Sequence, residues 1–307
     1  AVLRIDHLDA DSCAVIAHGH EAGIKHVIVS GPQATDHLLP CLGSSSLRMT
    51  WDLSQGFDGI FESGSDTPLQ EAVDAALKAT KRKTIDVLGL PPKAFMNQRL
   101  KGYVAGSVED FKKAKKVKDI ALVGPLPSKS LQKILSGPLK PTIWITPHDD
   151  CAHITPRLLE LADGASMQVI AHGTPCSTIL LTAAAAEDIS AMALWARWTA
   201  ELGMSVALPH TEQDPKTVLR DASEADPISQ ATWRLLSSTA MLSRPAALAV
   251  QPDVEDTFGI RPIIARAMEL AKKELADAGR PPVNGTLRSD LWDEIDADKK
   301  AFVKNDF

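Results

Sequence analysis

The segment Thr142-Ile-Trp-Ile-Thr146, followed by Pro147-His-Asp-Asp150, decides the fold class of this chain. Its β-branched and aromatic side chains are typical of a strand that is buried on both faces, and the proline with its polar neighbours ends that strand. The same order of an apolar run, a Gly or Pro turn and a helical stretch recurs along the sequence. The predicted strands are residues 2–6, 26–30, 59–63, 84–88, 119–123, 142–146, 167–171, 204–208 and 246–250.

This recurrence predicts a parallel α/β protein, because successive strands are separated by enough residues for one crossover helix. Two architectures fit the pattern. One is a pair of Rossmann-like, doubly wound lobes, and the other is a (β/α)8 barrel with an extra N-terminal βα unit. The nine predicted strands exceed the eight of a barrel, and the short gaps between the strands that begin at residues 119, 142 and 167 suit compact sheet crossovers. We therefore expect two lobes.

The two-lobed interpretation divides the chain into an N-terminal α/β lobe (1–145), a C-terminal α/β lobe (146–280) and a C-terminal arm (281–307). After Gly279 the composition changes to Arg280-Pro-Pro282 and then to a charged tail, which is typical of a surface helix or an extended arm. Such an arm could lie over a neighbouring subunit. The sequence is therefore compatible with a homo-oligomer or with a subunit of a larger complex.

Composition limits the partners of the chain. Its 307 residues carry 33 basic and 39 acidic side chains, which gives a net charge of −6 without a long basic run. Neither a nucleic acid nor a membrane partner is expected on that basis. The sequence also lacks an apolar run long enough to span a bilayer. Its 4 cysteines lack the paired spacing of a zinc or disulfide framework, which predicts reduced thiols in a cytoplasmic protein.

Ligands of parallel α/β folds bind beyond the carboxyl ends of the strands, so the residues that follow the predicted strands are the candidates for a site. Histidines and carboxylates are frequent among them. The candidates are Asp6, His7, Asp9, Asp11, Gln33, Asp36, Glu62, Asp66, Ser128, Lys129, His148, Asp149, Asp150, His153, His172, Thr174, His210, Glu212 and Asp253.

The residues after strand 142–146 have the chemistry of a metal site. Histidine and carboxylate side chains bind Zn, Mn or Fe, and a divalent metal with an open coordination position activates water for hydrolysis. We expect His148, Asp150 and His153 to be the ligands. The alternative is structural, since Asp150 could instead cap the helix that follows.

The ends of strands 142–146 and 204–208 supply the predicted acid–base residues. His148 or His210 would transfer protons, and Asp149 or Asp150 would orient the reacting group or bind the metal. We expect convergence at one end of the sheet, because the carboxyl ends of parallel strands share an edge. The residues expected to converge are His148, Asp149, Asp150 and His153 together with His172 and His210.

The loop His172-Gly-Thr-Pro-Cys-Ser177 has the composition of an anion-binding turn. His172, Gly173, Thr174 and Ser177 could hold a phosphate or carboxylate group through hydroxyls and free backbone N–H groups at the start of a helix. No Walker loop and no GxGxxG motif occurs in the sequence, so the usual dinucleotide fingerprint is missing.

The stretch Asp6-His-Leu-Asp-Ala-Asp11, after a short predicted strand, resembles the first motif of the DHH-type phosphoesterases. The resemblance implies that histidine and aspartate side chains of this stretch bind divalent metals. The Asp-His-His motif of that family is absent, because the corresponding position reads Asp86-Val-Leu-Gly89. Membership is therefore not inferred, and the carboxylates can equally cap the helix that follows.

These residues predict a hydrolase or lyase that acts on a small polar, anionic metabolite. The substrate would bind in a His/Asp-rich cleft that could also hold a divalent metal. Three alternatives remain open. The chain could be a non-catalytic small-molecule-binding protein or a subunit of a larger complex. It could also be a nucleotide-dependent oxidoreductase, which the fold class alone suggests.

Overall fold

The computed structural model describes residues 1–6, 12–30, 40–43, 46–62, 66–148, 154, 156–173, 184–185, 187–209 and 214–224. By their internal contacts, the residues form two compact units. The first comprises residues 1–147, 155–173 and 199–217, and the second comprises residues 148–154, 174–198 and 218–307. All of the described strands belong to the first unit.

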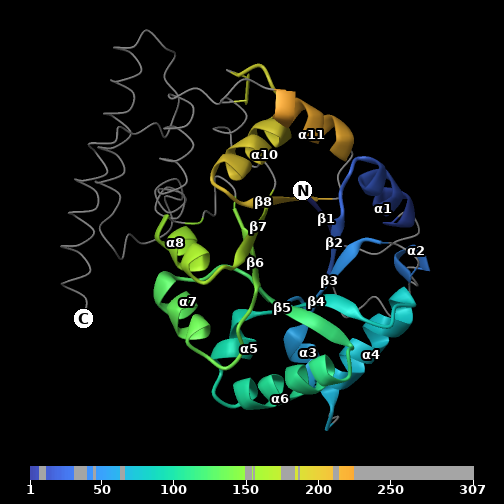
Figure 1. Ribbon diagram of the computed structural model, residues 1–307, viewed down its shortest axis with the longest axis vertical. Coiled ribbons are helices and arrows are strands. Elements are labelled where there is room, and N and C mark those ends of the chain that lie inside the picture. Colours follow the sequence, from blue (N-terminus) through green and yellow to red (C-terminus); the bar gives the residue numbers. More distant parts are fainter. Residues whose placement is uncertain are drawn as a thin grey trace, which may run out of the picture. The chain divides into compact units, whose positions relative to one another are not determined.

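The first unit is built on a closed parallel barrel, seen in Figure 1 as a ring of strands. Each strand pairs with the next, and β1 pairs with β8, for example through Leu3 opposite Leu208, so the sheet has no edge. The strands are β1 (Val2–Ile5), β2 (His26–Ser30), β3 (Arg48–Asp52), β4 (Ile85–Leu90), β5 (Val117–Val123), β6 (Ile143–Pro147), β7 (Gln168–His172) and β8 (Ser205–Pro209).

The two-lobed prediction is therefore wrong, and the barrel alternative is right. The unit that begins with β1 is part of the ring rather than an addition to it. The strand predicted at 59–63 is also wrong, since Phe57–Glu62 forms helix α3 and the third strand is Arg48–Asp52. That strand was missed because its polar ends conceal the apolar middle. The predicted strand 246–250 lies outside the described residues, and the boundaries at 280 and 281 stay predictions.

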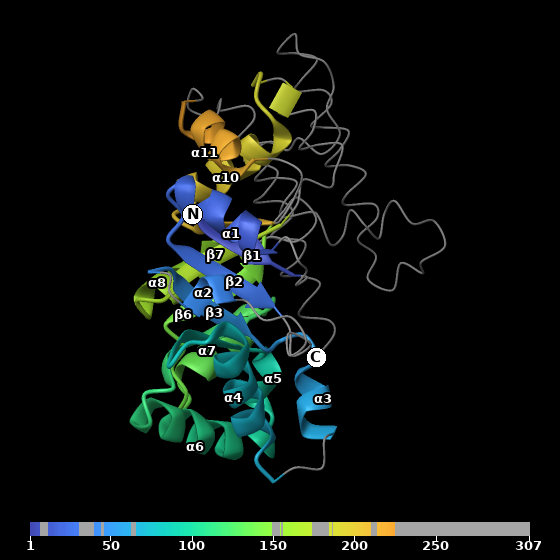
Figure 2. The ribbon, with the colours of Figure 1, turned by 90° about the vertical axis from the view of Figure 1, so that its right-hand side faces the viewer.

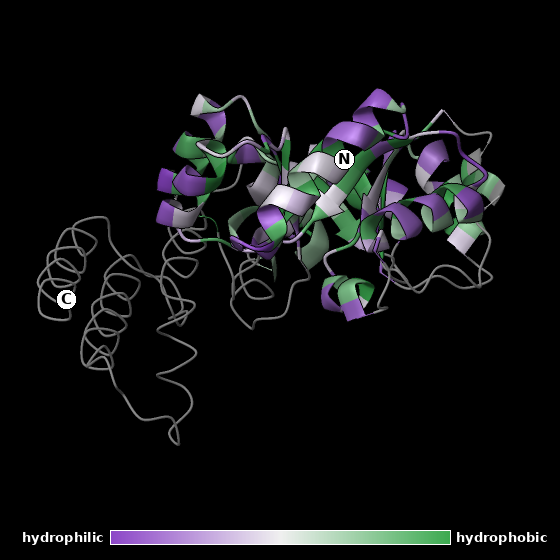
Figure 3. Ribbon diagram, turned by 90° about the horizontal axis from the view of Figure 1, so that it is seen from below, coloured by the Kyte–Doolittle hydropathy of each residue, from purple (hydrophilic) through white to green (hydrophobic). Residues whose placement is uncertain are grey.

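Helices follow the strands, and those of the first unit lie outside the ring (Figure 1, Figure 2). In Figure 3 the strands are mostly hydrophobic, whereas the helices carry hydrophilic residues as well, as expected of elements that cover a barrel. The remaining helices are α1 (Ser12–Glu21), α2 (Pro40–Gly43), α4 (Pro68–Thr80), α5 (Pro92–Met96), α6 (Leu100–Lys113), α7 (Ser128–Leu135), α8 (Pro156–Gly164), α10 (Ala191–Glu201) and α11 (Pro215–Glu224).

The barrel interior is filled with small and β-branched side chains. Because side chains alternate along a strand, one face of each strand points into the barrel. The buried cluster comprises Val2, Ile28, Val87, Ala121, Val123, Ile143, Ile145, Ile170 and Ala207. Such a core is packed rather than hollow, so a ligand has to bind at one end of the barrel or on its outside.

Cys13 of α1 and Cys41 of α2 form a disulfide, with their Cα atoms 5.8 Å apart. The prediction of reduced thiols is thus wrong for this pair. Cys151 and Cys176 lie outside the described residues. In the described part of the chain, no helix is both long enough and apolar enough to cross a membrane.

A buried histidine lies at the amino end of the barrel. His26 begins β2, is 7% exposed, and its Nε2 atom lies 2.7 Å from the Thr50 hydroxyl oxygen. Burial, and secondly the nearby Arg48, lower the pKa of His26 to about 4. The imidazole is therefore neutral at pH 7 in the folded chain, whereas an unfolded histidine has a pKa near 6.5.

Acid should destabilise the fold through His26. Between pH 6.5 and pH 4 the unfolded chain takes up a proton at this position and the folded chain does not, so stability falls as pH falls through that window. The loss should reach about 3 kcal/mol near the lower limit. Urea unfolding at several pH values should show a shallower pH dependence for His26→Gln than for the parent. The exposed His20→Gln on α1 is the control, and an unchanged slope in His26→Gln would refute this assignment.

Candidate functional site

The carboxyl end of the barrel carries a cluster of polar side chains that point inward. Val2 and Ile28 belong to the interior, so residues an even number of positions further along the same strands point to the same side. This places Arg4, Asp6 and Ser30 at the opening. Together with Asp52 at the end of β3 and His172 at the end of β7, they form what we call the barrel mouth.

An ion-pair network joins the first three strands at the barrel mouth. The Arg4 Nε atom donates a hydrogen bond to Asp6 Oδ1 over 2.8 Å, and Arg4 Nη2 lies 3.7 Å from Asp52 Oδ2. The Ser30 hydroxyl donates to both carboxylates, at 3.0 Å to Asp6 and 3.4 Å to Asp52. The backbone N–H of Ser54 donates to Asp52 Oδ1 over 2.8 Å.

Burial makes this network essential to the fold. The side chain of Arg4 is 8% exposed and that of Asp52 is fully buried, whereas Asp6 is 38% exposed. A buried charge is tolerated only when an opposite charge and hydrogen bonds compensate the loss of water. Arg4 Nη1 has no hydrogen-bond partner among the described residues. The one guanidinium faces two carboxylates, through Nε toward Asp6 and through Nη2 toward Asp52.

Gly89 of β4 allows the buried carboxylate to lie where it does. A Cβ atom at residue 89 would come within 2.9 Å of Val123 Cγ2 and 3.1 Å of the Asp52 Cα atom, both inside normal contact distance. Gly89 also pairs with Asp52 in the sheet. The close approach of β3 and β4 at the barrel mouth thus depends on the absence of a Cβ atom at residue 89.

His172 is the one described histidine among the mouth residues. It is half-buried at the end of β7, and burial, followed by the Arg4 charge, lowers its pKa to about 4, against an opposing effect of Asp6. His172 is therefore neutral at pH 7. It and Gly173 were predicted to bind an anion, but the other two predicted residues, Thr174 and Ser177, lie outside the described residues.

His148 follows β6 and is packed among side chains of the second unit. It is 1% exposed, and its carbonyl accepts a 2.7 Å hydrogen bond from Trp195 Nε1. Its Nδ1 atom accepts the backbone N–H of Ile154 at 3.4 Å, and its ring centroid lies 4.5 Å from that of Trp198. These contacts hold the ring in a protein interior.

The other residues of the predicted metal and acid–base site are Asp149, Asp150, His153 and His210, and they lie outside the described residues. Their convergence with His148 stays a prediction. Within the described residues, no three His, Cys, Asp or Glu side chains are placed to hold a metal ion. Sequence reasoning had selected Asp6 and His172 but missed Arg4, Ser30 and Asp52. An arginine inside the apolar run Val2–Ile5 was the available signal.

Comparison with solved structures identifies the architecture. The aldose reductase from Schistosoma japonicum aligns at 12% identity over 85% of this chain and 91% of its own, with a TM-score of 0.60. An aldo-keto reductase enzyme from a Medee basin deep-sea metagenome library aligns at 14% identity over 78% and 90%, with a TM-score of 0.59. This chain has an aldo-keto reductase-like (β/α)8 fold. No family model and no curated protein matches the sequence.

These neighbours correct the functional prediction. They are oxidoreductases, so the hydrolase or lyase interpretation is wrong, and with it the prediction of a metal-dependent enzyme. A further neighbour is an aldo-keto reductase complexed with NADPH, which aligns at 10% identity over 78% of this chain and 84% of its own, with a TM-score of 0.57. The ligand of that protein is therefore a nicotinamide cofactor.

The described residues near β8 do not fit the phosphates of such a cofactor. In (β/α)8 barrels, phosphate groups often bind near the loops after the seventh and eighth strands and at a helix N-terminus there. The helix that follows β8 is α11, and Asp214 occupies its N-terminus by accepting hydrogen bonds from the N–H groups of Lys216 and Thr217, both at 3.2 Å. The Thr217 hydroxyl and these N–H groups lower the pKa of Asp214. A phosphate would meet a negative charge there.

Removing the guanidinium should cost much of the stability of the fold. Arg4→Met leaves the buried Asp52 without its cation, and the expected loss in free energy of unfolding is about 3–5 kcal/mol. Arg157→Met removes an exposed pair with Glu160 and should change stability by no more than about 0.5 kcal/mol. Chemical denaturation measures both, and equal effects would contradict the role of the network.

Adding one methyl group at the barrel mouth should also destabilise the chain. Gly89→Ala forces Val123 and Asp52 away from residue 89, at an expected cost of about 1–3 kcal/mol. Gly106→Ala on α6 has open space around the new Cβ atom and should stabilise its helix by up to about 1 kcal/mol. Thermal unfolding of the two variants should therefore shift in opposite directions, and a neutral Gly89→Ala would show that β3 and β4 can separate freely.

Proposed function

We propose that this chain is a non-catalytic protein that uses an aldo-keto reductase-like barrel as the scaffold of a binding subunit in a larger complex. The observation that carries the proposal is the ion-pair network of the barrel mouth. The cation of Arg4 lies between the carboxylates of Asp6 and Asp52, so these three charged groups are engaged with one another within the fold. They serve the fold rather than a bound substrate.

Proton transfer is the second part of the argument. Reduction of a carbonyl group needs a hydride donor and a group that gives a proton to the oxygen, with a pKa near the working pH. His172, with a pKa of about 4, is neutral at pH 7 and so lacks the acidic proton of an imidazolium. Lys93, after β4, forms an ion pair with Asp58 at 2.5 Å.

The phenol that could supply a proton lies elsewhere. The chain has 1 tyrosine, and this residue, Tyr103, belongs to α6 outside the ring of strands (Figure 1). Its hydroxyl accepts the backbone N–H of Leu69 at 3.4 Å, and its ring contacts Phe61 with centroids 5.9 Å apart. Tyr103 thus joins α6 to its neighbouring helices, which is a packing role.

A barrel whose described mouth residues are engaged in ion pairs can still act as a rigid scaffold, since closure of the sheet fixes the ends of the strands. The charged C-terminal residues 281–307 are the segment that we assign to contact with a partner, as the sequence predicted. The whole chain would then contribute binding, and a different subunit would carry the chemistry.

Two measurements test this proposal. The purified chain should show no rise in melting temperature with NADPH and no NADPH oxidation with a panel of aldehydes and ketones. An aldo-keto reductase of known activity is the positive control. Aldehyde-dependent oxidation of NADPH by the parent chain would overturn the proposal in favour of a reductase.

The chain isolated under native conditions from its own cells should have the mass of a complex with one fixed partner. Truncation after residue 280 should abolish that association, whereas Glu109→Gln on the exposed face of α6 should not affect it. A chain that is always isolated alone would contradict the role as a subunit.

A further inference from the structure

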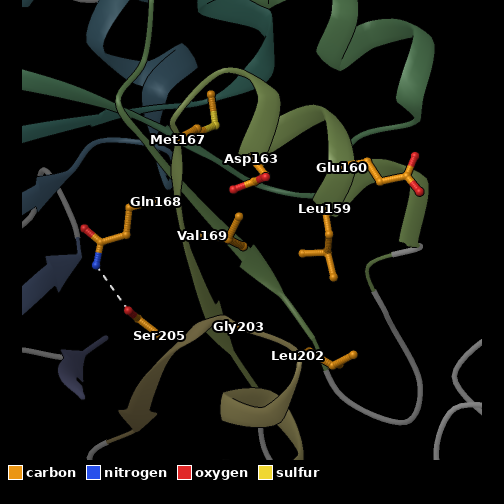
Figure 4. A pocket seen from close by; sticks show the side chains of 9 residues that line it. All are labelled: Leu159, Glu160, Asp163, Met167, Gln168, Val169, Leu202, Gly203 and Ser205. Atoms are coloured by element: carbon orange, nitrogen blue, oxygen red, sulfur yellow. Dashed lines mark hydrogen bonds between the residues drawn. The ribbon is translucent and has the colours of Figure 1, made fainter.

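A second candidate site lies at the opposite end of the barrel from the mouth. A groove with a volume of about 440 Å³ lies at the amino ends of β7 and β8, beside helix α8. Figure 4 shows the side chains that line it. All of its lining residues belong to the first unit. They are Leu159, Glu160, Asp163, Met167, Gln168, Val169, Leu202, Gly203 and Ser205. Cavities of about 300–1,000 Å³ are typical of small-molecule sites.

The walls of this amino-end groove are apolar. Leu159 of α8 and Leu202, before β8, are half-buried and leave part of their side chains open to the groove. Met167 is 5% exposed and Val169 is 9% exposed, so the base of the groove is closed by core side chains. The groove therefore offers apolar surface that a ligand body of matching shape could cover.

The charge of the amino-end groove is negative. Glu160 and Asp163 lie one turn apart on α8, and no lysine or arginine is among the described lining residues. Glu160 is engaged by Arg157 at 3.3 Å, and in Figure 4 its carboxylate points away from Asp163. The Asp163 carboxylate makes no ion pair with any described residue, and Figure 4 shows it on the side of Gln168 and Val169.

The base of the groove also presents polar groups. Gln168 Nε2 donates a 3.1 Å hydrogen bond to the Ser205 hydroxyl, which ties the starts of β7 and β8 together. This bond fixes the Gln168 amide at the edge of the apolar surface. A ligand with an apolar body and a polar head would therefore place its head near Asp163 and Gln168 and its body between Leu159 and Leu202.

We propose that the amino-end groove binds a small organic ammonium cation, with Asp163 as its counter-charge and the two leucines as the contacts of its apolar body. The proposal goes beyond the role as a subunit and does not rest on it. A cation is favoured over a neutral or anionic ligand because the Asp163 carboxylate makes no ion pair with a described residue and the lining contains no lysine or arginine, whereas Glu160 is already paired with Arg157. Exposure of Asp163 to water limits the gain, so weak binding is expected.

Three probes with one apolar body test the proposal: 4-phenylbutylamine, 4-phenylbutanol and 4-phenylbutyrate. Methyl NMR titrations of the full chain should show saturable shifts at Met167, Leu159 and Leu202, in the order amine, then alcohol, then carboxylate. The affinity for the amine should fall as salt rises, because an exposed ion pair is screened. Equal binding of the three probes, or no shift at these methyl groups with the amine, would overturn the proposal.

Matched variants separate the charge from the shape. Asp163→Asn should weaken amine binding about two- to five-fold, the range of an exposed ion pair, and leave alcohol binding unchanged. Leu159→Ala should weaken both probes. Glu109→Gln on α6 removes the same charge at a distance and should change neither. An Asp163→Asn variant that binds the amine as the parent does would contradict the assignment of the counter-charge.

An ammonium group can also come from a lysine of another protein. A blocked peptide with one lysine between two leucines provides the comparison. If the peptide bound these methyl groups more tightly than the amine, the groove would be a contact for a partner chain, and the small-molecule assignment would fall. Weaker binding of the peptide would support it.

Discussion

The fold depends on how the charge of Arg4 is compensated inside the barrel. A guanidinium that is only 8% exposed needs carboxylates within reach, and these come from its own strand and from β3. Ser30 of β2 donates to both of them. The network therefore sets how three strands meet, and it requires a glycine in β4 to make room. The charged side chains of the barrel mouth, which could otherwise attract a substrate, thus form ion pairs within the fold.

The sequence predicted the parallel α/β class well, because buried strands such as Thr142–Thr146 are apolar along their whole length. It could not predict closure of the barrel, because that depends on pairing between β1 and β8, whose residues are far apart in the chain. The strand Arg48–Asp52 was missed for a physical reason. Its charged ends pair with other charges within the fold. In a sequence pattern, however, charged residues indicate exposure to solvent rather than a strand.

The candidate site was only partly predictable for a related reason. A histidine after a strand can face a ligand or pack in an interior, and the residue type does not distinguish these. His148 is packed against Trp198, while His172 stands at the barrel mouth. Asp6 was selected because it follows a strand, whereas Arg4 lies within one. The groove at the amino ends of the strands could not be selected at all, since the rule for parallel sheets directs attention to the other end.

Closure of the ring also has a consequence for how the chain folds. Val2 and Ala207 are partners in the register of β1 and β8, so the last strand of the ring must be available before the first is paired on both sides. Contacts between such distant residues are slow to form, because the intervening chain loses loop entropy before it gains them. During synthesis, the edge of β1 that pairs with β8 would stay unpaired until β8 has been made. The Cys13–Cys41 disulfide joins the helices after β1 and β2. Once formed, it would hold β1 close to β2 while the other edge of β1 is still unpaired.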